Sequence, residues 1–219
     1  MSLVGGYYTL GQHGSEEFIE RKSRFIGEAA PAFSEEEALS FIKNVKDAHK
    51  SASHHCFAYI IGENAGLMRY SDDGEPQGTA GIPILDVLKK NDLVNCVAVV
   101  TRYFGGVLLG AGGLTRAYSA GCAKAVRAAG IVTAQSSLRL SAVIGYAYWD
   151  AIDYLMSKLP VCELEREFTD KVLLRLTVRE QDAKDVIKEI IGYSDGSAQI
   201  EQSDPFYHQW QLPPPEADA

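Results

Sequence analysis

The residue pattern predicts an α+β protein of two domains. Segments with apolar residues at helical spacing occur among strand-like segments in both halves of the 219-residue chain. The composition changes near Gln135, where a polar Gln-Ser-Ser sequence suggests a hinge. We therefore expect a first domain over residues 1–135, a second over residues 136–212 and a disordered tail over residues 213–219, where three prolines follow one another.

The first domain is expected to mix strands with helices. Residues 23–33 read as a strand, and Ser34-Glu35-Glu36-Glu37 has the form of a capping box that opens a helix. Residues 54–62 are strand-like with apolar side chains on both faces, which predicts burial on both sides. The expected order continues with a strand over 67–71, a polar loop over 71–83, a helix over 84–92, a strand over 94–103, and a helix over 114–129 ended by Gly130.

The second domain parses into six elements. They are expected as a strand over 138–147, a helix over 148–159, a hairpin of strands over 161–170 and 171–180, a helix over 180–191 and a final strand over 197–210. This order, βαββαβ, is the ferredoxin-like pattern.

The charge of the chain is negative overall but unevenly distributed. The net charge is −8 and the pI is about 5.1, which argues against indiscriminate binding to nucleic acid. Residues 1–135 hold 13 Lys or Arg and 14 Asp or Glu, whereas residues 136–219 hold 8 and 15. Between Leu93 and Gln135 there are four basic residues and no acidic one. This local positive charge favours an anionic ligand there.

Cysteine usage and hydropathy bear on the location of the protein. The four cysteines are scattered, without the spacing of a metal site, and three of them have apolar neighbours, as buried free thiols do. No apolar run approaches the roughly 20 residues needed to span a bilayer. We expect a cytoplasmic protein without a membrane partner, a metal or another cofactor.

The most unusual stretch runs from Val97 to Gly121. Five glycines fall within nine residues, from Gly105 to Gly113, between a strand and a helix of small residues. Such a loop before a helix N-terminus leaves backbone N–H groups free for a phosphate or carboxylate. The alternative is a tight turn that lets helix and strand pack closely. The segment lacks the Walker and Rossmann patterns, so ATP binding is weakly supported.

Several side chains near this stretch could bind an anion or a nucleic acid. Arg102 at a strand end and Arg116 in the first helical turn could converge on one anion, because arginine suits bidentate phosphate contacts. Aromatic residues beside the basic ones (Tyr70, Tyr103, Phe104 and Tyr118) could stack on bases. The predicted anion or nucleic-acid site comprises Arg24, His54, Asp73, Arg102, Tyr103, Gly105, Gly106, Gly110, Gly112, Gly113 and Arg116.

The histidines and the acidic loop have structural alternatives. His49, His54 and His55 lie close in sequence to Asp72, Asp73 and Glu75, a set that could form a metal site or an acid–base pair. However, His54 and His55 are adjacent in a strand and point to opposite faces. We therefore expect one edge histidine and one hydrogen-bonded histidine, with neither a metal nor a catalytic residue. The loop could instead be ordered by contact with Arg102 or Arg69.

The motifs just described resemble those of a known family. His54-His55-Cys56, the loop SDDGEPQGTAG and the segment RYFGG followed by LGAGGLTRAY are similar to the signature of the IMPACT/YigZ family. The resemblance implies a first domain like the second domain of small-subunit ribosomal protein five. It implies a second domain like the C-terminal domain of elongation factor G. The resemblance covers essentially the whole chain.

The resemblance also implies a link to translation and to the stress response. Eukaryotic members oppose a stress-activated kinase of an initiation factor by competing for its ribosome-associated activator. We expect a non-enzymatic regulator that binds RNA, the ribosome or a translation-control protein, without sequence-specific DNA binding. The alternatives are a nucleotide- or phosphometabolite-binding enzyme of GHMP-kinase-like fold, and a protein-interaction module that uses the acidic second domain.

Overall fold

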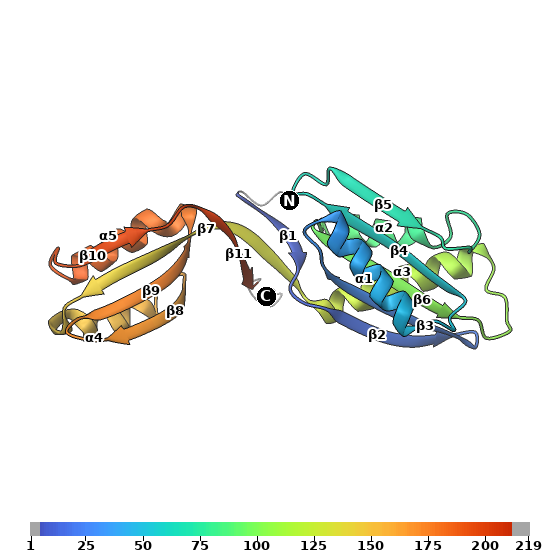
Figure 1. The fold of residues 1–219 in the computed structure, drawn as a ribbon, viewed down its shortest axis with the longest axis horizontal. Helices are drawn as coiled ribbons and strands as arrows, with labels where there is room; N and C mark the ends of the chain where they lie inside the picture. Colours follow the sequence, from blue (N-terminus) through green and yellow to red (C-terminus); the bar gives the residue numbers. More distant parts are fainter. Residues whose placement is uncertain (1–4, 212–219) are drawn as a thin grey trace, which may run out of the picture. The chain divides into compact units, whose positions relative to one another are not determined.

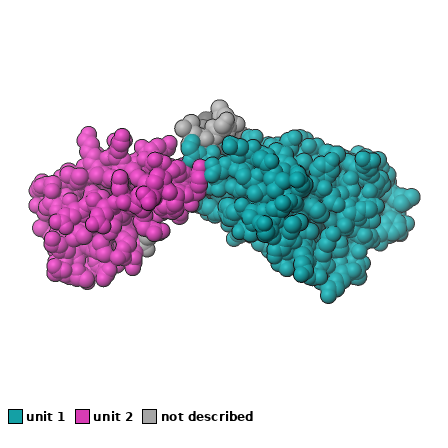
Figure 2. Space-filling view, turned by 45° about the horizontal axis from the view of Figure 1, so that its top comes forward, with its two compact units in different colours: residues 1–134, 209–219 teal, residues 135–208 magenta. Residues whose placement is uncertain are grey.

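The computed structural model (Figure 1) describes residues 5–211, except for the side chains of residues 163 and 164. The chain forms two compact units, coloured separately in Figure 2. Unit 1 comprises Met1–Ala134 with Gln209–Ala219, and unit 2 comprises Gln135–His208. The structure contains two sheets together with α-helices, as expected for an α+β protein. The tail predicted over residues 213–219 lies outside the described residues.

Unit 1 is built on an antiparallel five-stranded sheet. Its strands, in spatial order, are β2 (Gly14–Glu20), β3 (Ser23–Pro31), β6 (Cys96–Tyr103), β4 (His54–Ile61) and β5 (Leu67–Ser71). Strand β2 and the preceding β1 (Gly6–Leu10), which pairs with β7, were not predicted. Strand β2 is a charged edge strand with a mostly exposed face, so its apolar pattern is weak.

Helices cover both faces of this sheet (Figure 1). Helix α1 (Glu35–Ala48) packs on one face, while α2 (Gly81–Lys90) and α3 (Ala111–Ala129) pack on the other. The capping box is confirmed: the Ser34 hydroxyl accepts from the Glu37 N–H at 3.2 Å, and the Glu37 carboxylate accepts from the Phe33 N–H at 2.7 Å. Burial of β4 on both faces is confirmed as well.

Two helices of unit 1 begin three residues earlier than the residue pattern predicts. Helix α2 begins at Gly81 rather than Ile84, because the carboxylate of Asp72 accepts from the N–H groups of Ala80 and Gly81 and so caps its first turn. Helix α3 begins at Ala111 rather than Leu114. Glycine lowers helix propensity by only about 1 kcal/mol, which packing of the helix on the sheet overcomes.

The small residues of α3 allow the expected close packing on the sheet. A Cβ atom at Gly27 of β3 would lie 2.1 Å from the carbonyl oxygen of Gly121 in α3. Glycine is therefore required where the helix backbone crosses the strand.

In unit 2 the strand order is β10-β7-β9-β8, and every neighbouring pair is antiparallel. The elements that lie wholly in unit 2 are α4 (Tyr146–Met156), β8 (Val161–Phe168), β9 (Val172–Arg179), α5 (Ala183–Tyr193) and β10 (Gln199–Gln202). Strands β7 (Ile131–Ile144) and β11 (Phe206–Gln211) are shared between the two units. Even-numbered residues of β7 and β9 form one core with α4 and α5.

Two details of unit 2 differ from the expected elements. Strand β7 runs without interruption through Gln135-Ser136-Ser137, where a hinge was expected. The single final strand is divided into β10 and β11, both of which pair with β7. Asp204-Pro205 separates them, and proline cannot donate to a strand ladder.

Candidate functional site

The glycine-rich connection leads from β6 to the N-terminus of α3. Three of its glycines are explained by the backbone. A Cβ at Gly105 would lie 1.9 Å from the carbonyl oxygen of Lys22, while Gly106 and Gly110 have φ angles of 80° and 70°. These positions agree with the tight-turn alternative.

Gly112 and Gly113 lie in the first turn of α3 instead of the loop. A Cβ at Gly113 would approach the Leu109 Cβ at 3.0 Å, which favours glycine there. A Cβ at Gly112 would meet only the flexible Arg116 Nη1, at 3.6 Å. Contacts within the described residues therefore do not require glycine at position 112.

The N-terminus of α3 is open. Its N-cap is Gly110, which supplies no side-chain hydrogen bond, and its first turn contains no acidic residue. The first N–H groups of a helix have no partners within the helix, and its N-terminal end carries a partial positive charge. This end of α3 can therefore accept an anion.

Arg102 is not available for the predicted anion site. Only 5% of the residue is exposed, and its Nη1 donates to the Glu75 carboxylate at 2.6 Å. Its Cζ lies 5.6 Å from the ring centroid of Phe25 and 5.4 Å from that of Phe104. The charge of Arg102 is thus neutralised inside unit 1, and the alternative that it orders the acidic loop is confirmed.

Glu75 is the centre of this buried network, whereas the residue pattern placed it in the acidic loop, within a set that could form a metal site or an acid–base pair. Its Oε1 accepts from the Tyr118 hydroxyl at 2.7 Å as well as from Arg102, and it lies 3.9 Å from His54 Nε2. Tyr118 is completely buried, so it cannot stack on a base, contrary to the expectation from the sequence. Burial, followed by the nearby Cys56 and Glu75, raises its pKa.

The rest of the acidic loop is held by Asp72 and Asp73. Burial acts to raise the pKa of the Asp72 carboxyl, but its bonds from the N–H groups of Gly78, Gly81 and Ala80 outweigh burial and lower the pKa. Asp73 accepts from the backbone N–H of His55 at 2.7 Å and pairs with Lys46 at 3.1 Å. Predicted site residue Asp73 therefore has partners within unit 1.

Two further predicted residues, Tyr103 and Arg24, lie together near the end of α1. The Tyr103 hydroxyl lies 3.0 Å from His49 Nδ1, and the Arg24 guanidinium lies 5.1 Å from the Tyr103 ring centroid. Arg24 also pairs with Glu17 at 2.7 Å. His54 lies on the opposite face, where its Nδ1 is 2.9 Å from the Asp73 carbonyl oxygen.

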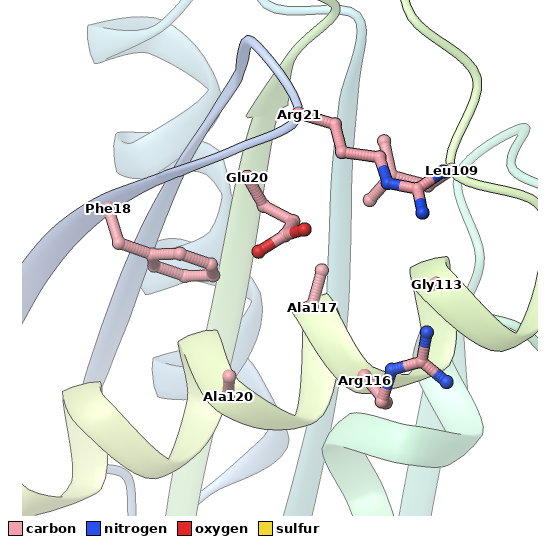
Figure 3. A pocket seen from close by; sticks show the side chains of 8 residues that line it. All are labelled: Phe18, Glu20, Arg21, Leu109, Gly113, Arg116, Ala117 and Ala120. Atoms are coloured by element: carbon pink, nitrogen blue, oxygen red, sulfur yellow. The ribbon is translucent and has the colours of Figure 1, made fainter.

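Arg116 faces a different environment from Arg102. Together with Arg21, Glu20, Phe18, Leu109, Gly113, Ala117 and Ala120 it lines an open pocket, here called the Arg21–Arg116 pocket (Figure 3). Arg102 is not part of its lining, so the predicted convergence of Arg102 and Arg116 does not occur. The second arginine is Arg21, from the basic cluster that precedes β3. The spacing in sequence gave no sign that it lies close to α3.

The three buried cysteine thiols, Cys56, Cys96 and Cys122, are unsuited to nucleophilic chemistry at neutral pH. Burial raises the pKa of Cys56 and of Cys96 to about 12, and burial also raises the pKa of Cys122. A thiol with such a pKa stays protonated, whereas the thiolate is the nucleophile.

Comparisons with known proteins agree with this arrangement of motifs. The model of the Impact N-terminal domain matches residues 21–126. The chain is 34% identical to IMPACT family member YvyE of Bacillus subtilis over 205 residues, and this alignment covers 94% of each chain. The chain belongs to the IMPACT family. A second family member, YigZ of Escherichia coli, is 33% identical over 82% of this chain and 89% of its own.

Two further matches are to a solved structure and to a eukaryotic relative aligned over less than half of this chain. A crystal structure described as that of a hypothetical protein superimposes with a TM-score of 0.59 and 30% identity, covering 90% of this chain and 97% of its own. Protein IMPACT homolog of Saccharomyces cerevisiae is 31% identical over 46% of this chain and 40% of its own. None of the helices in residues 5–211 combines the length and apolar character needed to cross a membrane.

Proposed function

We propose that this IMPACT family member is a non-enzymatic regulator of translation that binds RNA, free or in the ribosome, through unit 1. The role in translation rests on the family, which includes eukaryotic proteins named IMPACT. The binding role rests on the Arg21–Arg116 pocket.

The convergence of Arg21 and Arg116 carries this proposal. Both side chains are exposed and reach the same pocket from different elements, the β2–β3 turn and the second turn of α3 (Figure 3). Neither makes an ion pair or side-chain hydrogen bond within residues 5–211. Two free guanidinium groups beside an open helix N-terminus are suited to a phosphate.

The distribution of charge along the chain favours binding of an anion at this pocket. The acid-free segment from Leu93 to Gln135 contains the loop and α3, whereas the chain has a net charge of −8. An RNA phosphate is therefore attracted more to this segment than to the acidic remainder of the chain.

Fluorescence-anisotropy titration with a single-stranded RNA tests the proposal. We expect Arg21→Ala and Arg116→Ala each to weaken binding several-fold. Arg127→Ala, which removes the same charge about 16 Å further along α3, is the matched control and should have a smaller effect. Equal effects of all three variants, or no RNA binding by the unmodified protein, would contradict the proposal.

A translation-control protein is a second candidate partner, and the exposed apolar side chains of the loop favour it. Leu108 is 80% exposed, and Phe104 and Val107 are exposed beside it. A partner that buries this tip would be sensitive to Leu108→Ser, whereas binding to RNA through the pocket would not. Crosslinking in cell extract, compared between the unmodified protein and Leu108→Ser, distinguishes a protein partner from RNA.

The proposal includes a finer description of the two domains. The order β10-β7-β9-β8, with α4 after β7 and α5 after β9, supports a ferredoxin-like unit 2 similar to the C-terminal domain of elongation factor G. For unit 1 we propose the fold of the second domain of small-subunit ribosomal protein five. An experimental structure of the chain, superimposed on both domains, tests this description.

A further inference from the structure

The Arg21–Arg116 pocket contains an acidic residue that phosphate binding does not explain. Glu20 is exposed, and its carboxylate lies between the Phe18 ring on one side and the two guanidinium groups on the other (Figure 3). It makes no ion pair or side-chain hydrogen bond within residues 5–211. A free phosphate would be repelled by this carboxylate, so the best ligand carries a hydrogen-bond donor next to its anionic group.

The size of the pocket limits the ligand. Its volume is about 240 Å³, below the roughly 300–1,000 Å³ typical of small-molecule sites, and it is open to solvent. A pocket of this kind suits one unit of a longer chain better than a whole free cofactor. Its lining is polar at the arginine end and apolar at the end formed by Phe18, Ala117 and Ala120.

The β2–β3 turn that presents two of these charges has an unusual backbone. Glu20 pairs with Ser23, so only Arg21 and Lys22 form the turn, with φ angles of 45° and 67°. Two-residue turns with positive φ at both positions normally contain Asn-Gly, and other residues there are strained. The close approach of Gly105 to the Lys22 carbonyl holds this turn in place. The turn thus keeps Glu20 and Arg21 in fixed positions at the pocket.

A ribonucleotide unit matches these groups in order. Its phosphate fits the guanidinium groups of Arg21 and Arg116. The adjoining 2′-hydroxyl can donate to a carboxylate, as ribose hydroxyls do to the acidic residue of dinucleotide-binding folds. The base then lies toward Phe18 and the small side chains of α3.

We infer that this pocket binds one ribonucleotide of single-stranded RNA and that Glu20 distinguishes ribose from deoxyribose. The inference rests on the proposed function and adds the chemical feature that the site recognises. The 2′-hydroxyl is the group by which a protein tells RNA from DNA. Deoxyribose leaves the Glu20 carboxylate unpaired next to a bound phosphate, which weakens binding of DNA.

The test compares single-stranded RNA with DNA of matching sequence, using the full chain and fluorescence anisotropy. The unmodified protein should prefer RNA roughly ten- to a hundredfold, the magnitude of one hydrogen bond to a charged group. Glu20→Ala should bring this ratio close to one, mainly by strengthening the binding of DNA. Asp86→Ala removes an exposed carboxylate on α2 outside the pocket, and it should leave the ratio unchanged.

The outcomes separate the inference from the proposed function. If RNA binds and Arg116→Ala weakens it, but Glu20→Ala changes the ratio no more than Asp86→Ala, the inference is wrong and the proposed function stands. If RNA does not bind, or if only a phosphopeptide probe binds in an Arg116-dependent manner, both are wrong. Circular dichroism melts of each variant establish that the exposed substitutions leave the fold intact.

Discussion

At the scale of single residues, Arg102 illustrates how the position in a strand determines what an arginine can do. Counting along β6 in steps of two places Arg102 in phase with Cys96, Ala98 and Val100, all buried against α2 and α3. That alternation predicts a buried arginine, and a buried arginine needs a carboxylate. The partner, Glu75, is 27 residues away in an irregular loop, so the residue pattern could suggest contact between this loop and Arg102 but not which carboxylate makes it.

Glu75 should be the most sensitive side chain of unit 1 with respect to stability. Its side chain is 4% exposed and pairs with Arg102, so Glu75→Gln leaves that guanidinium buried without a counter-charge. We expect the free energy of unfolding to fall by about 3–5 kcal/mol, measured by urea denaturation. The exposed substitution Asp86→Asn, as control, should change it by less than about 0.5 kcal/mol. A Glu75→Gln variant as stable as this control would rule out a structural role for the network.

Asp72 gives a pH-dependent prediction. Its pKa is lowered in the folded protein, so its carboxylate stabilises the fold above the unfolded-state pKa of about 3.9, and this stabilisation is lost as the pH falls through the folded-state value. Asp72→Asn should therefore be less stable than the unmodified protein at pH 7, by about 1–2 kcal/mol, because an amide has one acceptor oxygen and no charge for the three N–H groups that the carboxylate binds. The difference should shrink below about pH 4. Urea denaturation at pH 7 and pH 3 measures both values, and a difference that stays constant with pH would contradict this role of Asp72.

At the scale of elements, features that depend on residues close together in the sequence were predicted, and features that depend on distant residues were not. The start of α1 was predicted because its cap is formed by residues 34–37 alone. The start of α2 was not, because its cap comes from Asp72, nine residues before Gly81. In the same way, Arg116 was recognised from the helix that carries it, but Arg21 reaches the pocket through the pairing of β2 with β3.

The glycines of the connection between β6 and α3 should separate into structural and ligand-facing ones. Gly105→Ala places a Cβ against the Lys22 backbone and should destabilise unit 1 by more than about 2 kcal/mol. Gly112→Ala lies in a helix with room for a methyl group, and it should stabilise the fold by up to about 1 kcal/mol.

Thermal unfolding and RNA titration of both variants distinguish these roles. We expect Gly112→Ala to melt at a higher temperature than the unmodified protein and yet to bind RNA more weakly, because its methyl group lies at the open end of α3. Equal destabilisation by the two substitutions would show that both glycines serve only the backbone.

At the scale of the whole molecule, the salt dependence of RNA affinity distinguishes binding through scattered lysines from binding through the Arg21–Arg116 pocket. A chain with a net charge of −8 that bound RNA through scattered lysines would bind weakly and with little dependence on individual residues. A defined arginine–phosphate contact instead adds a fixed amount to the salt dependence of binding. Each phosphate neutralised on a single strand contributes about 0.7 to the magnitude of the slope of log K against log salt concentration.

The salt dependence of RNA affinity, compared between the unmodified protein, Arg116→Ala and Arg127→Ala, tests the central claim most directly. Binding through the Arg21–Arg116 pocket predicts a slope smaller in magnitude by about 0.7 for Arg116→Ala and nearly unchanged for Arg127→Ala. Identical slopes for all three proteins would contradict a phosphate contact in this pocket.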